Sequence, residues 1–285
     1  MRKLSITSVA LAAGFLLTSA ARSQQRAPQS ASSSAKPASS APFDVHDLSG
    51  MWDFFNRGVT GQGIYASPSK TPPPMTAWGK ARYAEARPEY GPKAAIAGND
   101  PITQCVPTGI PRVMFYPQPH EIVQTPDRVF MFFEREHAFR QIWTDGRQHP
   151  TDLEPTYMGD SIGWWDGDTF VVDTVGFNEN KNWIDFFGDP HSDQLHLIER
   201  YKRVDHDTLT MQLIVDDPKA YTQTWVGDTK IFKLLPPKQS YMEELFCVWS
   251  EENAFTNRIR LKSAGKAAQG QKAQPAPAAG GKAKQ

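Results

Sequence analysis

The stretch MGDSIGWWDGDTFVVDTVGF at residues 158–177 decides the fold. It contains two runs rich in aromatic and β-branched residues, 158–165 and 169–176, and such runs favour strands. Asp166-Gly167 lies between the two runs, and this dipeptide is typical of two-residue hairpin turns. The stretch therefore predicts an antiparallel β-hairpin.

The pattern of short apolar runs and tight turns continues on both sides of this hairpin. Leu209, Met211, Leu213 and Val215 recur at every second position, which marks the core side of a strand. The run at 129–133 is apolar on both faces, as in a strand that is covered on both sides. This spacing predicts a mainly β domain, an antiparallel meander closed or nearly closed into a barrel. The further strands are expected at 120–125, 128–134, 138–144, 195–204, 208–215, 229–235 and 241–248.

The chain before residue 120 carries fewer strand signals. Residues 47–55 predict a first strand, and residues 76–86 predict one short helix with Thr76 as its N-cap. Residues 87–119 are rich in proline, which removes backbone donors and disfavours regular structure. This proline-rich segment is expected to wrap the barrel as irregular chain.

Two resemblances support this fold. The run Asp47-Leu48-Ser49-Gly50-Met51-Trp52 resembles the G-x-W entry strand of lipocalin-type (calycin) barrels. The longer segments IVQTP (122–126), MGDSIGWWDGDTFVVDTVGF (158–177), HLIERYKRVDHDTL (196–209) and DDPKAYTQTW (216–225) are similar to a large family of secreted proteins from Gram-negative bacteria. These resemblances imply a calycin-like barrel and a periplasmic or secreted location, and they leave the activity open.

The two ends of the chain predict export and disorder. Arg2 and Lys3 precede an apolar run at 4–17 and a set of small residues, which is the pattern of a signal peptide. The run is short for a permanent anchor, which is the alternative interpretation. The remaining terminal segments have too few apolar residues to form a core. The expected organisation is a signal peptide (1–23), a disordered linker (24–42), a β-barrel domain (43–262) and a disordered Ala/Gly/Lys tail (263–285).

The net charge of zero hides an asymmetry along the chain. All 31 acidic residues but only 22 of the 31 basic residues lie in the segment 43–262, so the expected domain is strongly acidic. An acidic surface repels phosphate backbones, and nucleic acid is therefore not expected as a partner. No apolar run of the mature sequence reaches membrane-spanning length, so the domain is not expected to be membrane-embedded.

The chain contains two cysteines, Cys105 and Cys247. An even number of cysteines in an exported protein predicts a disulfide, and two separate buried thiols are the alternative. Closing a loop of this length removes about 4–5 kcal/mol of unfolded-state entropy in the chain model.

Three long connections, 145–157, 177–194 and 217–228, are separated by tight turns. In an antiparallel meander successive connections alternate between the two ends of the sheet, so these three are expected at one barrel mouth. Long loops in compact domains are usually functional, and barrel mouths are frequent ligand sites. The expected ligand-binding residues of this mouth are His149, Tyr157, Trp183, Tyr221 and Trp225.

Four residues are candidates for acid–base chemistry: His191, Asp193, Asp173 and Glu199. A histidine held by a carboxylate can serve as a general base, and the same groups can bind a metal. Asp173 and Glu199 alternate with apolar residues in their strands, so each must be paired, solvated in a cavity or raised in pKa. The alternatives are ordinary turn chemistry for His191 and Asp193 and structural ion pairs, with Arg140 or Arg200, for the two strand residues. For Asp173 a further alternative is that its face of the strand is simply outside the barrel.

Two functions follow from these features. The first is an exported barrel module that binds a small organic or carbohydrate ligand at one mouth. The alternative is a periplasmic hydrolase or lyase that uses the His, Asp and Glu groups of that mouth. A structural envelope protein, the third class, would have no pocket. The sequence identifies no cofactor or metal and no oligomeric state.

Overall fold

The computed structural model describes residues 41–54, 66–91, 93–179 and 182–263. The predicted signal peptide, most of the predicted linker and the predicted tail from residue 264 onward lie outside the described residues. The described residues all belong to one compact unit, 38–285.

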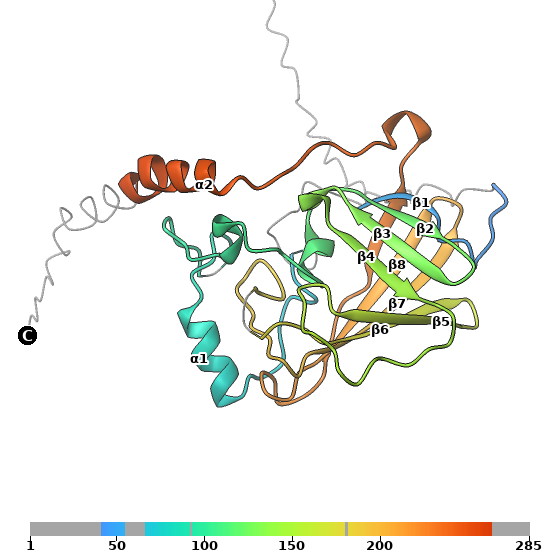
Figure 1. Cartoon of the computed structure of the whole chain (residues 1–285), viewed down its shortest axis with the longest axis horizontal. Helices are drawn as coiled ribbons and strands as arrows, with labels where there is room; N and C mark the ends of the chain where they lie inside the picture. Colours follow the sequence, from blue (N-terminus) through green and yellow to red (C-terminus); the bar gives the residue numbers. More distant parts are fainter. Residues whose placement is uncertain (1–40, 55–65, 92, 180–181, 264–285) are drawn as a thin grey trace, which may run out of the picture. The chain divides into compact units, whose positions relative to one another are not determined.

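Within the described residues, nine strands close into a mainly β barrel, as the sequence predicts (Figure 1). The order around the barrel is β10-β1-β2-β3-β4-β5-β6-β7-β8, and pairing of β10 with β8 closes it; the short β9 also pairs with β8. The bounds are β1 Gly50–Phe54, β2 His120–Gln124, β3 Arg128–Phe133, β4 Phe139–Trp143, β5 Asp160–Asp166, β6 Thr169–Val175, β7 His196–Asp205, β8 Thr208–Asp216, β9 Trp225–Val226 and β10 Lys230–Leu234.

One pair of neighbouring strands breaks the antiparallel pattern. β4 and β5 pair in parallel, at Ile142 with Ser161 and at Trp143 with Ile162. A parallel pair requires a connection that crosses from one end of the sheet to the other. The expectation that 145–157 lies wholly at one mouth is therefore wrong, because this crossover starts at one end of the barrel and finishes at the other (Figure 1).

The barrel thus has two different ends. We call the end where β6 stops at Val175 and β7 starts at His196 the long-loop rim, and the opposite end the tight-turn rim. The tight turns at 166–168 and 205–207 lie at the tight-turn rim, and the connections 177–194 and 217–224 lie together at the long-loop rim, as predicted.

The predicted strand at 241–248 is also wrong. These residues have no regular structure, and Tyr241 and Phe246 are about 60% exposed (61% and 64%). The physical reason is that the barrel is already closed: β10 pairs with both β1 and β8, so no strand edge remains there for a further strand.

The two α-helices lie outside the barrel wall (Figure 1). The predicted helix is α1, Ala77–Glu85, and Thr76 caps it through a hydrogen bond from Gly79 N to its Oγ1. A second helix, which was not predicted, follows residue 248, and five short helical turns lie between or after the strands among the described residues. Their bounds are η2 Pro101–Gln104, η3 Arg112–Phe115, η4 Arg135–His137, η5 Pro237–Gln239, α2 Trp249–Phe255 and η6 Thr256–Arg260. Among the described residues, no helix has the length and apolar character needed to cross a bilayer.

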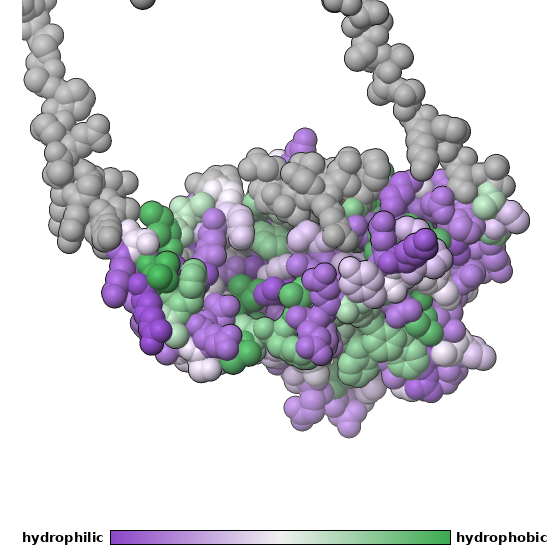
Figure 2. All heavy atoms as spheres, turned by 90° about the horizontal axis from the view of Figure 1, so that it is seen from above, coloured by the Kyte–Doolittle hydropathy of each residue, from purple (hydrophilic) through white to green (hydrophobic). Residues whose placement is uncertain are grey.

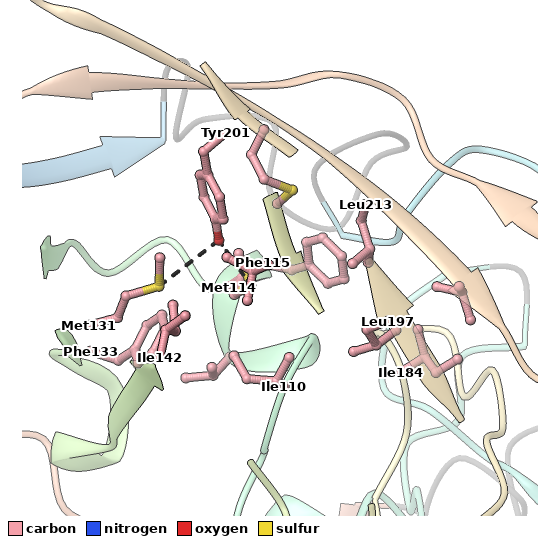
Figure 3. Packing of buried hydrophobic residues seen from close by; sticks show 14 of the residues in the cluster. Ile110, Met114, Phe115, Met131, Phe133, Ile142, Ile184, Leu197, Tyr201 and Leu213 are labelled. Atoms are coloured by element: carbon pink, nitrogen blue, oxygen red, sulfur yellow. Dashed lines mark hydrogen bonds between the residues drawn. The ribbon is translucent and has the colours of Figure 1, made fainter. Parts of the chain in front are cut away.

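The barrel interior is filled with side chains. Alternate residues of β8, from Leu209 to Val215, point inward, as their period predicts. The turn η3 inserts Met114 and Phe115 into the interior, where Tyr201 and Met131 pack against them (Figure 3). The centre of the barrel is therefore a packed core, and a ligand site must lie at a rim or on the outer wall.

Cys105 and Cys247 form the predicted disulfide, with 5.5 Å between their Cα atoms. The bridge joins the end of the η2 turn to the segment before α2. On the face drawn in Figure 2, apolar residues lie in several separate areas among polar ones, as on an ordinary folded surface.

Candidate functional site

Three of the residues predicted at the mouth are buried at the long-loop rim and form hydrogen bonds between its loops. They are His191, Tyr221 and Trp225. His191 is 2% exposed, and its Nε2 lies 2.8 Å from Asn182 Oδ1; burial lowers its pKa, so it is a neutral hydrogen-bonding group. Tyr221 donates from its hydroxyl to Pro190 O at 2.9 Å, and Trp225 donates from Nε1 to Ser69 at 2.8 Å. These contacts tie the loops to each other.

Asp193 and Tyr157 lie at the same rim in other surroundings. Asp193 is exposed and accepts a hydrogen bond from Lys219 Nζ at 3.0 Å. Tyr157 is half-buried, and its carbonyl accepts a hydrogen bond from Ile110 N at 3.1 Å. Gly109 packs against that carbonyl with a φ of +64°, and a Cβ there would lie only 2.3 Å from the oxygen. Tyr157 thereby anchors the segment that leads into η3.

Glu199 lies inside the barrel, fully buried, in a network centred on Arg140. The guanidinium donates to both Glu199 oxygens, at 2.8 and 2.9 Å, and to Ser161 and Thr174. The Tyr201 hydroxyl donates to Glu199 Oε2 at 2.7 Å. The structural ion pair that was the alternative interpretation of Glu199 is the one observed.

Asp173 lies on the outer wall of the barrel and not in its interior. His196 Nε2 is 2.7 Å from Asp173 Oδ1, and His149 Nε2 is 3.4 Å from the same oxygen. The structure thus brings His149 and Asp173 together, but it separates both from Glu199 in the interior. It also separates them from His191 in the connection 177–194, which we call the loop cap. Among the described residues, no group of three or more His, Cys, Asp or Glu side chains could hold a metal ion.

A cleft at the long-loop rim has the features of a ligand site. It has a volume of about 250 Å³. We call it the aromatic cleft, because rings from three separate segments form its walls. It is lined by Tyr90, Phe115, Tyr116, Pro117, Gln118, Arg135 and Phe186.

Each wall of the aromatic cleft is placed by a different element. Tyr116 ends the η3 turn, and Phe186 belongs to the connection from β6 to β7; their ring centres are 4.6 Å apart. Tyr90 follows α1 and meets Phe186 edge-on at 6.0 Å. Arg135 comes from the connection between β3 and β4, with its Cζ 4.7 Å from the centre of the Tyr116 ring.

Two polar atoms in the cleft lack hydrogen bonds within the described residues: Arg135 Nε and Gln118 Oε1, both buried. Arg135 has one ionic contact, from Nε to Glu136 Oε1 at 3.8 Å, which is too long for a hydrogen bond. The other Glu136 oxygen accepts two hydrogen bonds from Thr108. Buried polar groups normally find partners, so these two atoms mark a place where a ligand group would supply them.

The backbone beside Arg135 is strained. Glu136 and His137 have φ values of +63° and +48°, which non-glycine residues rarely adopt. Such conformations gather at functional sites, where the surroundings hold them in place. Here, Glu136 is held by Thr108, and His137 Nε2 lies 3.0 Å from Glu243 O.

A buried ion pair forms the floor beside the cleft. Arg112 donates two hydrogen bonds to the Asp100 carboxylate, at 2.8 and 2.5 Å, and its Cζ lies 5.4 Å from the Trp183 ring and 5.3 Å from the Phe186 ring. Burial alone would lower the pKa of Arg112, but the hydrogen bonds and charge of Asp100 outweigh it and raise that pKa. Trp183, predicted to bind a ligand, therefore stacks on an internal cation.

The phenol of Tyr116 is neutral at any physiological pH. Burial raises its pKa to about 12, against the opposing charges of Arg112 and Arg135. A second hollow of about 330 Å³ adjoins the aromatic cleft and shares four of its residues. Its outer side is formed by 244–247, the segment that the disulfide holds.

Sequence reasoning found part of this site. It selected the 177–194 loop that contains Phe186, but it missed Tyr90, Tyr116, Gln118 and Arg135. Three of these lie in the proline-rich segment that was expected only to wrap the barrel, and Arg135 lies in a short connection with no motif. A signal for two of them is that Tyr90 and Tyr116 are the two tyrosines of that proline-rich segment; Gln118 and Arg135 have no sequence signal.

Comparison of the chain with models of known protein families, with curated proteins and with solved structures finds no match. The closed barrel is compatible with a calycin-like fold. The similarity to secreted proteins of Gram-negative bacteria stays a prediction.

Proposed function

We propose that this protein is an exported barrel module that binds a small, planar organic anion in the aromatic cleft. The observation that carries this proposal is the pair of buried polar atoms without partners, Arg135 Nε and Gln118 Oε1, between aromatic walls. Ligand pockets are typically apolar with a few polar groups that fix the orientation of the ligand.

The chemistry of the cleft favours a carboxylate on a flat ring. Among the described residues that line the 250 Å³ cleft, Arg135 is the one with a charged side chain, and its contact with Glu136 is long, at 3.8 Å. A guanidinium pairs with a carboxylate through two parallel hydrogen bonds. The Tyr90, Tyr116 and Phe186 rings offer faces and edges to a planar body. The Gln118 oxygen is an acceptor and suits a hydroxyl or amino group on the ligand.

The alternative of a hydrolase or lyase lacks a converging set of groups. Its four proposed residues occupy the loop cap, the surface, the outer wall and the barrel interior. Export has indirect support, since disulfides such as Cys105–Cys247 form and persist in oxidising compartments. Sequencing of the mature N-terminus tests export: a start near Gln24 supports it, and an intact Met1 in the cytoplasm contradicts it.

The binding proposal is tested by calorimetric titration of the full mature chain with 4-hydroxybenzoate. The matched ligands are 4-hydroxybenzamide, which lacks the charge, and acetate, which lacks the ring. We expect 4-hydroxybenzoate to bind at least 10-fold more tightly than either. Mass spectrometry of the protein as purified would show whether a compound of this class accompanies it.

Two variants locate the binding. Arg135→Gln should weaken 4-hydroxybenzoate at least 10-fold, because the charged partner of the carboxylate is gone. Arg200→Gln is the matched control, since Arg200 lies on the outer wall and pairs with Asp166 at 3.0 Å. Equal affinities of the two variants, or no heat with any of the three ligands, would reject the proposal.

A further inference from the structure

A third hollow, of about 360 Å³, lies on the outer wall of the barrel, away from the aromatic cleft. We call it the outer groove. It exists because β4 and β5 pair in parallel, which sends the crossover 144–159 over the outside of the sheet. The groove is lined by Trp143, Gly146, Arg147, Gln148, Ile162, Gly163, Trp164 and Asp173.

The floor of the outer groove is one lateral row of the sheet. Trp143 of β4, Ile162 of β5 and Asp173 of β6 are direct neighbours across the strands. Gly163 adds no side chain, and a Cβ there would come within 2.7 Å of Phe170 in the core. Gly163 therefore faces the core, and its neighbours Ile162 and Trp164 face the groove.

The crossover is fastened to the wall by a chain of four side chains. His149 Nδ1 lies 2.6 Å from Asp160 Oδ1, and His196 Nε2 lies 2.7 Å from Asp173 Oδ1. His149 Nε2 is 3.4 Å from the same Asp173 oxygen and makes no hydrogen bond among the described residues. The 146–148 side of the groove is thus held at a fixed distance from its floor.

Every charge that lines the outer groove is paired within the protein. Burial alone would raise the pKa of Asp173, but His196 and His149 outweigh it and lower that pKa, so the carboxylate is ionised and balanced by histidine. Arg147 pairs with Asp145 at 2.6 Å, and its guanidinium lies 3.4 Å from the centre of the Trp143 ring. The groove therefore offers no free charge to attract an ion.

What the groove does offer is an indole and neutral hydrogen-bonding groups. Trp164 is 45% exposed, so its indole is accessible to a ligand in the groove. Gln148 is exposed beside it and supplies donors and an acceptor. The Asp173 oxygens supply further acceptors.

We propose that the outer groove binds a neutral hydroxylated ring, that is, a saccharide unit. Such a ring has an apolar C–H face that packs on an indole and hydroxyls that bond to carboxylate and amide groups. Trp164 is the packing surface, and Asp173 and Gln148 are the polar contacts. This site is independent of the aromatic cleft, because no residue lines both.

The experiment titrates the full mature chain with cellobiose and maltose and follows the indole Nε1–H resonance of Trp164 by NMR. The resonance is assigned by its loss in Trp164→Phe. We expect one of the two disaccharides to shift it in a saturable way. Tetramethylammonium serves as the cationic probe, because an indole beside a carboxylate is also a potential cation site.

The variants separate the groove from the rest of the surface. Trp164→Ala should weaken the disaccharide at least 10-fold without a loss of folding, since the side chain is exposed. Trp249→Ala is the matched control, because Trp249 is 53% exposed and lies on α2. Asp173→Asn should weaken binding while 4-hydroxybenzoate titration stays unchanged.

Three results would overturn the proposal. They are no saturable shift with either disaccharide, equal weakening by Trp164→Ala and Trp249→Ala, and a larger saturable shift with tetramethylammonium than with the sugars. None of these results bears on the aromatic cleft, which has its own probe.

Discussion

The barrel interior and the aromatic cleft each contain an arginine, fully buried in the interior and half-buried in the cleft, and the surroundings of the two differ. Arg140 in the interior donates four hydrogen bonds, two of them to Glu199. Arg135 in the cleft has one long ionic contact and a buried Nε without a hydrogen bond among the described residues. A satisfied network stabilises a fold, whereas an unsatisfied one is available to a ligand.

The largest effect is expected where the satisfied network is broken. Arg140→Met leaves Glu199 buried and unpaired, which should lower the free energy of unfolding by about 3–5 kcal/mol. Urea unfolding measures it, and Arg128→Met is the control, since Arg128 pairs with Asp127 at the surface and its loss should leave stability nearly unchanged. A loss below about 1 kcal/mol for Arg140→Met would remove the distinction between the two arginines.

A second effect in the interior concerns acid. His120 is buried between Phe133 and Phe232, and burial lowers its pKa to about 4 from the ordinary 6.5. The unfolded chain therefore binds a proton that the folded chain excludes, and stability falls as the pH drops from 6.5 to 4, by about 3 kcal/mol. In His120→Leu the free energy of unfolding, measured by urea unfolding, should fall much less between pH 6.5 and pH 4. His206→Leu, at an exposed turn, should retain it.

Removal of the disulfide tests whether the region beside the cleft stays folded without a covalent link. The double variant Cys105→Ser/Cys247→Ser should lower the free energy of unfolding by about 2–4 kcal/mol. It should also weaken 4-hydroxybenzoate, because the segment 244–247 beside the cleft loses its anchor. Thermal unfolding and calorimetry measure the two effects. An unchanged thermal unfolding midpoint would show that the segment 244–247 keeps its place without the disulfide.

The smallest effect has the opposite pH dependence and lies in the loop cap. Asp185 Oδ1 accepts hydrogen bonds from Phe187 N and Asp189 N, and both carboxyls are buried. Burial and the charge of Asp185 raise the pKa of Asp189 well above its usual value. The folded state retains a proton that the unfolded state releases, so stability falls as the pH rises from about 3.8 through the raised pKa.

Asp189→Asn should therefore raise the stability at neutral pH and remove this decline. Asp193→Asn is the control in the same loop. Its carboxylate is exposed, and the hydrogen bond from Lys219 lowers its pKa, so its small contribution is lost as the pH falls. Urea unfolding at pH 4, 6 and 8 checks both variants, and a parallel response of the two would contradict the raised pKa of Asp189.

The fold could be predicted because its signals are local. The Asp166-Gly167 turn and the period-two run from Leu209 to Val215 are read within ten residues. The parallel pairing of β4 with β5 has no such signal, since it depends on which edges remain when the other strands have paired. The predicted strand at 241–248 failed for the same reason.

The site could be predicted only in outline, because its parts are far apart in the chain. Tyr90, Arg135 and Phe186 meet only when three connections reach the same rim. The sequence also does not show on which side of the sheet a strand residue lies. Asp173 and Glu199 both alternate with apolar residues, yet Asp173 faces the outside of the barrel and Glu199 faces Arg140 in the interior. Only the register between strands decides this.

The Cys105–Cys247 bridge also turns most of the domain into a covalent ring. The bridged residues are 142 positions apart, and the strands β2 to β10 all lie between them. A protease that cuts one connection inside this ring releases no fragment, since both new ends remain joined through the sulfur atoms. The strands can then stay paired, because the two pieces of the chain remain covalently linked. A nicked molecule should therefore run as a single species on a non-reducing gel and separate into pieces only after reduction.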